Sequence, residues 1–180
     1  VLRAVGFGEE SDELRRWRKS LPPSLELAME TIQLRPMLTY LRIRPERFTR
    51  GPRGVSVQQL SAEQREARCP CGTGDTLGEC CARYLLSMGD GALAPTAEAL
   101  MRSRYSAFAL GDVAHLEATW HPSTRPAGLE LDEDTRWMHL SIDDVVPGGP
   151  FDNAGIVEFT ATYRGPGGRG QQHERSSFVR

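Results

Sequence analysis

The sequence predicts an α+β protein in which a small metal-binding module precedes the main domain. Three observations support this fold class. All four cysteines lie within the stretch CPCGTGDTLGECC, residues 69–81. The segment after it has apolar residues at helical spacing, and the last part of the chain alternates between apolar and polar residues as strands do. Helices followed by several antiparallel strands are typical of a curved sheet packed on helices.

The composition favours a protein that folds in water. The chain has 180 residues, of which 39% are hydrophobic, so it can bury the core of one ordinary domain and a small module. No run of apolar residues approaches the roughly 18 that a membrane span needs. The N-terminus lacks the charged-then-apolar order of a signal peptide. We therefore expect a cytoplasmic protein without a membrane span.

The two parts of the chain differ in charge. Residues 1–68 carry thirteen Arg and Lys against nine acids, whereas residues 69–180 carry nine against fifteen. This asymmetry is mild beside the dense basic patches of nucleic-acid-binding proteins, so nucleic acid is not the expected partner. Association with RNA or the ribosome through the Arg-rich front remains an alternative hypothesis.

The front of the chain, residues 1–66, is expected to be a weakly ordered or helical basic extension that need not belong to the native protein. Ser11 is a suitable N-cap for one helical portion, and Pro22 and Pro23 separate it from a second. The stretch RPERFTRGPRG, residues 44–54, is rich in Arg, Pro and Gly and predicts a loop or linker.

Two linked helices are predicted after the cysteines. Thr96 is a suitable N-cap for the first, Gly111 a C-terminal stop, and Asp112 a cap for the second. The apolar residues that recur at helical spacing are Leu100, Met101, Tyr105, Phe108 and Ala109 in the first helix and Val113, Leu116 and Trp120 in the second.

Three strands are predicted in the remainder of the chain. WMHLSI, residues 137–142, places Met138, Leu140 and Ile142 on one face. GIVEFTATYR repeats the alternation, and a glycine-rich turn over residues 165–170 leads to the third strand, QQHERSSFVR. Because the chain ends inside that strand, we expect a sheet that is incomplete at the C-terminus.

Three hypotheses compete for the four cysteines. A disulfide framework requires an oxidising compartment, which the absence of a secretory signal does not favour. A redox pair normally has C-x-x-C spacing, which C-x-C and C-C lack. Four thiolates can instead form a tetrahedral zinc site, with an iron centre or no metal as the alternatives. Gly72 and Gly74 allow a tight turn in which backbone N–H groups point at sulfur, and Cys80 and Cys81 suit the start of a helix through CARYLL.

The stretch CPCGTGDTLGECC resembles a SEC-C motif, in which C-x-C is followed eight residues later by C-C or C-H. The later stretches APTAEALMRSRYSAFALGD, TWHPSTRP, RWMHLSI and HERSSFVR resemble, in this order, the YchJ-like family of bacterial proteins. The resemblance covers residues 69–180 and not residues 1–68. It implies a SEC-C module over residues 67–90 and an NTF2-like domain over residues 91–180. It also implies one structural zinc ion, held by Cys69, Cys71, Cys80 and Cys81.

This sequence departs from the family pattern in three places. Members usually begin close to the cysteines, and they usually continue into another strand after FVR. Ser177 replaces an arginine that often follows ERS, which leaves the role of charges on that strand open.

An NTF2-like fold implies a hollow. The polar and aromatic side chains available to line it are Arg102, Arg104, Tyr105, Trp120, His121, Trp137, His139, His173, Glu174 and Arg175. Two arginines and a tyrosine suit a small anionic ligand, because guanidinium offers paired donors. The alternative is that the aromatic residues are core and the arginines pair with acids. His121 is the candidate catalytic acid or base, although a histidine before Pro122 also suits a turn.

We expect a zinc-binding docking protein that captures a protein partner through the module. The absence of a nucleotide-binding loop and of an evident Ser-His-Asp arrangement disfavours catalysis. The competing hypothesis is an enzyme that acts on a small anionic substrate in the hollow. A module independent of the main domain predicts that zinc removal abolishes partner capture and leaves the larger domain folded.

Overall fold

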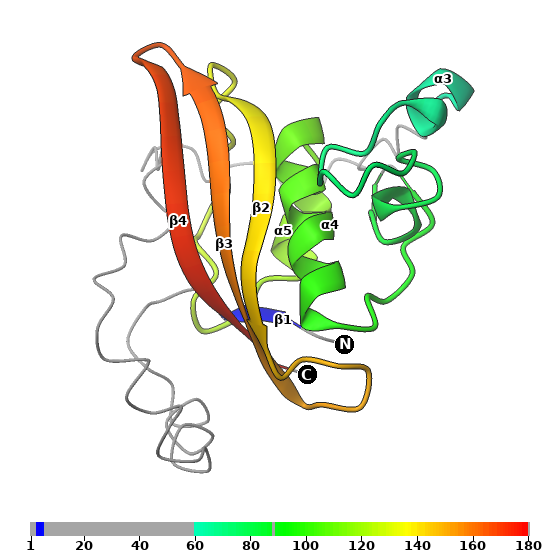
Figure 1. Cartoon of the computed structure of the whole chain (residues 1–180), viewed down its shortest axis with the longest axis vertical. Coiled ribbons are helices and arrows are strands. Elements are labelled where there is room, and N and C mark those ends of the chain that lie inside the picture. The colour runs from blue at the N-terminus through cyan, green and yellow to red at the C-terminus, as the bar shows by residue number, and fades with distance from the viewer. Residues whose placement is uncertain (1–2, 6–59, 88, 180) are drawn as a thin grey trace.

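The computed structural model describes residues 3–5, 60–87 and 89–179. Figure 1 shows a curved sheet on one side of the molecule, helices against it, and the cysteine module beyond the helices. In chain order the elements are β1 (Arg3–Val5), α3 (Ala62–Glu66), the 3₁₀ helix η2 (Cys81–Arg83), α4 (Ala97–Leu110), α5 (Val113–Ala118), β2 (Arg136–Val146), β3 (Ala154–Gly165) and β4 (Gly168–Val179). None of the helices among these residues is long and apolar enough to cross a bilayer.

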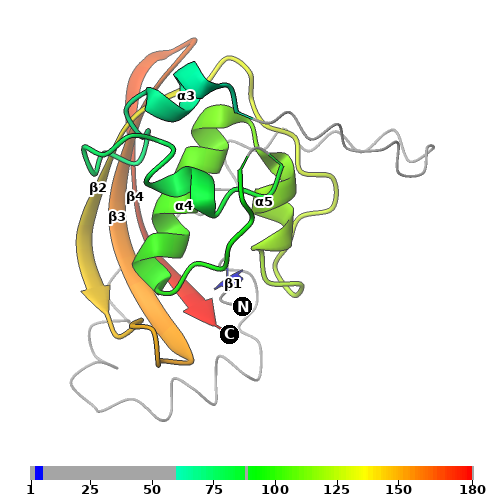
Figure 2. The ribbon, with the colours of Figure 1, turned by 90° about the vertical axis from the view of Figure 1, so that its right-hand side faces the viewer.

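The sheet is antiparallel, with the strand order β1-β4-β3-β2. The three long strands are the predicted ones, and β2, β3 and β4 follow each other as hairpins. β4 begins at Gly168, so the turn after β3 is shorter than predicted. Figure 2 shows the strands curving around α4, which confirms the expected α+β architecture.

The short strand β1, which the sequence did not predict, forms the edge of the sheet opposite β2. β1 pairs with the end of β4, with Arg3 opposite Val179 and Val5 opposite Ser177. Residues 6–59, on which the two front helical portions and the linker were predicted, lie outside the described residues.

The capping residues of α4 and α5 are those predicted. The Thr96 hydroxyl accepts a hydrogen bond from the backbone N–H of Ala99 at 3.1 Å. Gly111 ends α4 with a φ of 81°, a left-handed conformation that glycine adopts without steric cost. The Asp112 carboxylate accepts from the N–H of His115 at 3.0 Å at the start of α5. Local chemistry therefore decides where both helices begin and where α4 ends. The second helix is shorter than predicted, because α5 ends at Ala118 and Trp120 lies beyond it.

A bulge in β2 changes which side chains face the helices. Trp137 pairs with Tyr163 and His139 pairs with Thr162, so Met138 is an extra residue between them. Met138 is consequently 48% exposed instead of sharing the buried face with Leu140, as strict alternation predicted. Trp137 packs inward in its place.

The cysteine module and the main domain share one hydrophobic core. Cys71, Cys81 and Ala82 are buried in the same cluster as residues of α4 and of the sheet. The other members of this core include Leu100, Met101, Tyr105, Leu140, Val157, Phe159 and Phe178. Fully burying each large apolar side chain contributes about 1.5–3 kcal/mol to stability. The module is thus built into the domain rather than attached to it by a linker.

Candidate metal centre

Backbone hydrogen bonds shape the loop that carries the cysteines. The N–H of Cys69 donates to the carbonyl of Asp75 at 2.9 Å, and the N–H of Gly72 donates to the carbonyl of Cys69 at 3.2 Å. Gly72 has a φ of 80°, so the chain reverses there at a position that favours glycine. The N–H of Cys80 donates to the carbonyl of Thr76 at 3.1 Å. These bonds bring the C-x-C and C-C ends of the motif together.

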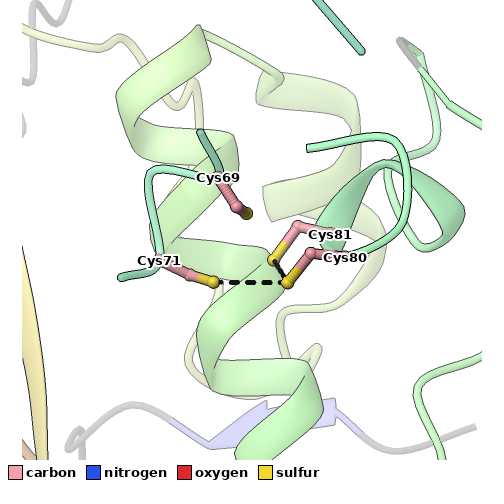
Figure 3. Close-up of side chains that lie close together, drawn as sticks. All are labelled: Cys69, Cys71, Cys80 and Cys81. Carbon is pink, nitrogen blue, oxygen red and sulfur yellow. Dashed lines mark hydrogen bonds between the residues drawn. The ribbon is translucent and has the colours of Figure 1, made fainter. Parts of the chain in front are cut away.

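The four sulfur atoms form one compact cluster. All lie within 4.8 Å of one another, with Cys71 and Cys80 separated by 3.5 Å and Cys80 and Cys81 by 3.8 Å (Figure 3). A tetrahedral zinc–thiolate centre with bonds of about 2.3 Å places its sulfur atoms about 3.8 Å apart. The donor set and its spacing therefore fit a tetrahedral metal ion bound by four thiolates. The 3₁₀ helix η2 begins at Cys81 itself and covers only Cys81–Arg83, so it is shorter than the helix predicted for the stretch CARYLL.

Hydrogen bonds among the cysteines shift the pKa values of Cys69 and Cys81 in opposite directions. The side chains of Cys71 and Cys81 hydrogen-bond to Cys69, and these bonds, aided by the backbone N–H groups of the same residues, lower its pKa against the effect of burial. The pKa of Cys81 is raised, because its thiol donates to Cys69 and Cys71 and because it is buried. Metal binding to four cysteines releases the protons of their thiols, so the affinity of such a site depends on pH.

Two side chains of α4 reach the cysteine loop. The Ser106 hydroxyl lies 3.7 Å from the sulfur of Cys69 and is completely buried. Arg102 donates through Nη1 to the carbonyl of Cys71 at 3.1 Å, while Glu98 holds its Nε at 2.8 Å. Thr73 adds a hydroxyl 3.3 Å from the sulfur of Cys80. Such outer contacts orient metal ligands, and the sequence did not reveal those from α4.

Some of the residues that were predicted to line the hollow are buried in the interior of the domain. Arg104 donates through Nη1 to the carbonyl of Leu116 at 3.1 Å and to the hydroxyl of Thr119 at 2.8 Å, and its guanidinium lies 4.7 Å from the centre of the Trp120 ring. Burial lowers the pKa of Arg104 to about 10, and the charge of Glu174 opposes this change. The carboxylate of Glu174 accepts from Gln172 at 3.0 Å and from the hydroxyl of Ser176.

Tyr105 and Trp137 form a second group. Their rings are 5.8 Å apart in an edge-to-face arrangement, and Trp137 also packs on Phe108 and Tyr163. Burial raises the pKa of Tyr105 to about 12, and the nearby charge of Cys71 adds to this effect. The Tyr105 hydroxyl is buried and has no hydrogen-bond partner within the described part of the chain. This part of the interior is mainly aromatic.

The remaining candidates lie elsewhere. His173 and Arg175 alternate along β4 with the buried Gln172 and Glu174, and both contact Glu158 at 3.0 Å. His139 is exposed on β2. His121 lies in a turn, where its Nδ1 is 2.7 Å from the hydroxyl of Ser123. The structure therefore does not gather His121 with Arg102, Arg104 and Tyr105 around one point.

A buried serine, histidine and aspartate lie close together without forming a catalytic triad. The Ser103 hydroxyl is 3.0 Å from Nε2 of His115. Asp112 accepts from the backbone of His115 rather than from its ring, and also binds the N–H and hydroxyl of Ser87. Ser103 and Asp112 are 0% exposed and His115 is 2% exposed, so the three side chains are shielded from solvent. Ser103 lies on α4 and His115 on α5, so the packing of the two helices brings them together.

Comparison with known proteins agrees with these features. The family described as "YchJ, middle NTF2-like domain" matches residues 96–180. A UPF0225 protein from Streptomyces coelicolor is 52% identical over 112 residues, which cover 62% of this chain and 85% of the relative. A UPF0225 protein from Chromobacterium violaceum is 50% identical over 123 residues, which cover 67% of this chain and 89% of the relative.

Two solved structures include the cysteine motif in their descriptions. A SEC-C motif-containing protein from Rhodopseudomonas palustris is 32% identical, with a TM-score of 0.52 and coverage of 63% of this chain and 88% of that one. A SEC-C motif-containing protein from Psychrobacter arcticus is 29% identical, with a TM-score of 0.53 and coverage of 65% and 74%. With its clustered cysteines and its helices packed on a curved sheet, the chain belongs to the YchJ-like family of UPF0225 proteins.

Proposed function

We propose that this chain is a zinc-binding docking protein of the cytoplasm, in which the metal stabilises a surface for a protein partner. The observation that carries this proposal is the closed ligand set. Four cysteines supply four thiolates, and three of them are at most 5% exposed. A tetrahedral ion held by four protein ligands keeps no open position for a substrate, which is typical of a structural site. Free thiols suit a reducing compartment.

Exposed apolar residues in the segment that follows the cysteines supply a surface for the partner. Leu86 and Leu93, in the segment after η2, are 43% and 65% exposed. Arg83 is also exposed and donates through Nε to the carbonyl of Cys80 at 3.0 Å. Loss of the ion would displace this segment because Cys80 and Cys81 begin it. Partner binding should therefore depend on zinc.

The test compares surface variants that leave the cysteines intact. We expect Leu86→Ser combined with Leu93→Ser to reduce partner capture and to leave zinc content and thermal stability unchanged. Phe151→Ser is the matched control, because Phe151 is 96% exposed in the loop between β2 and β3. The measurement is affinity capture with the full chain, followed by titration of the purified partner. Capture that survives complete zinc removal would contradict the proposal.

A second candidate function is binding of a small anion in the interior. Arg104 is 5% exposed, and the Nε1 of Trp120 and the Oε1 of Gln172 are buried and have no hydrogen-bond partner among the residues that the structure describes. Buried polar atoms require partners, which a ligand or water would supply. Titration with inorganic phosphate and with acetate, followed by tryptophan fluorescence, tests this role. We expect saturable quenching that Arg104→Gln abolishes, and an identical response in both proteins would exclude it.

A further inference from the structure

The four cysteines differ in how much of them solvent can reach. Cys69, Cys71 and Cys81 are 5%, 0% and 1% exposed, respectively, whereas Cys80 is only partly buried. An oxidant in solution therefore meets Cys80 first. Reactivity of cysteine toward peroxide depends on thiolate character and on access, and metal coordination keeps all four sulfurs as thiolates.

The surroundings of Cys80 also decide which cysteine would respond to its oxidation. The sulfur of Cys71 lies 3.5 Å away and that of Cys81 lies 3.8 Å away. Cys80 and Cys81 are adjacent, so their Cα atoms are about 3.8 Å apart, below the usual range of about 4.4–6.8 Å for a disulfide. Cys71 comes from the opposite end of the loop and has no such restriction. Figure 3 shows the sulfur atoms of Cys71 and Cys80 facing each other.

We propose that the metal centre is a peroxide-sensitive modification site in which Cys80 reacts first and Cys71 resolves it. The Cys80 thiolate attacks one oxygen of hydrogen peroxide, the O–O bond breaks, and Cys80 sulfenic acid and hydroxide form. The Cys71 thiolate then attacks the sulfur of the sulfenic acid and expels a second hydroxide, which leaves a Cys71–Cys80 disulfide. Two thiolates are oxidised by two electrons in total, and one peroxide is reduced.

The Cys71–Cys80 disulfide would remove two of the four metal ligands. Cys69 and Cys81 alone do not complete a tetrahedral site, so the ion would leave. Cys71 is bound through its carbonyl to Arg102, and Cys80 through its carbonyl to Arg83. The modification thus acts on both ends of the loop. It does not depend on the proposed docking role, since it concerns only the thiols and the ion.

The experiment uses the zinc-loaded full chain and measures three quantities as hydrogen peroxide is added. We expect zinc release, detected with a chromogenic chelator, to accompany a mass loss of two hydrogens and a Cys71–Cys80 linkage in peptide mapping. A thiol reductant with added zinc should restore the starting protein. Limited iodoacetamide labelling of the unoxidised protein should modify Cys80 before the other three cysteines. A first disulfide that lacks Cys80, or zinc retained after oxidation, would overturn the proposal.

Two matched variants separate the roles of the adjacent cysteines. Histidine is a good zinc ligand and does not form disulfides, so each variant keeps four donors. We expect Cys80→His to lose peroxide-induced zinc release and Cys81→His to retain it. The reverse order of sensitivity would contradict the assignment. Should either variant fail to bind zinc, the labelling order and the linkage in the wild-type chain decide the matter.

Discussion

Ser106 is a residue through which the main domain contacts the cysteine cluster directly. Its buried hydroxyl lies 3.7 Å from the sulfur of Cys69 and is placed to donate a hydrogen bond to the thiolate. Partners of this kind typically change metal affinity by about 10–100-fold. We therefore expect Ser106→Ala to weaken zinc binding by about tenfold, measured by competition with a chelator of known affinity.

The control for Ser106 is another buried serine of α4. Ser103 binds the ring of His115 and the carbonyl of Leu100, and no hydrogen bond joins it to a cysteine among the described residues. Ser103→Ala should lower the free energy of unfolding and leave zinc affinity unchanged. Equal losses of zinc affinity in the two variants would indicate a general packing effect instead of a specific contact.

The protonation of His115 makes the free energy of unfolding depend on pH. Burial, followed by the charge of Arg104, lowers its pKa to about 4, whereas the ordinary value is about 6.5. The folded protein therefore keeps His115 neutral while the unfolded chain takes up a proton as the pH falls below about 6.5. Its contribution to stability is complete above that pH and is lost progressively down to about pH 4, by at most about 3 kcal/mol. Urea unfolding at a series of pH values measures this loss.

The comparison for that measurement is His115→Gln, which removes the titrating ring. Carboxylates contribute to the pH dependence of both proteins, so the difference between the two curves isolates His115. We expect the variant to be less stable at pH 7 and its stability to decline less steeply between pH 6.5 and 4. Parallel curves would show that His115 does not carry this dependence.

At the scale of elements, the caps of α4 can be tested in isolation. The Thr96 hydroxyl accepts from the N–H of Ala99 and so satisfies one of the free donors at the helix start. Thr96→Ala should cost about 1 kcal/mol of stability, measured by urea unfolding. Thr96→Ser keeps an acceptor at the same place and should cost much less. A serine variant as unstable as the alanine variant would exclude capping as the cause.

The starts of both helices and the end of α4 were predictable because their signals are local. Thr96, Gly111 and Asp112 act on residues within a few positions of themselves, and the structure confirms all three. The strand details were not predictable to the same degree. The bulge that exposes Met138 is set by pairing with β3, and the pairing of β1 with β4 joins residues from opposite ends of the chain. Such long-range pairing leaves little trace in a short window of sequence.

At the scale of the whole molecule, one part of the site was predictable from the sequence and another part was not. The dense spacing of Cys69, Cys71, Cys80 and Cys81 in the sequence predicted their spatial cluster. In contrast, Arg102 and Arg104 are neighbours on α4, yet one binds the cysteine loop and the other stacks on Trp120 in the interior. Residue type and spacing alone did not separate these roles. The direction in which each side chain leaves the helix decides them.

The shared core also revises the expected consequence of metal removal. Cys71 and Cys81 are buried with Tyr105 and Phe159, so loss of the ion should loosen α4 as well as the loop.

A ligand present at about a thousand times its Kd stabilises a folded state by about 4 kcal/mol. For a domain of this size that corresponds to about 10 °C in Tm. We expect chelation to lower the Tm of the whole chain by about this amount and to reduce the near-ultraviolet circular dichroism of the aromatic core, with both effects reversed by zinc. An independent module would behave differently: chelation would remove a small early transition and leave the main unfolding transition and the aromatic signal unchanged.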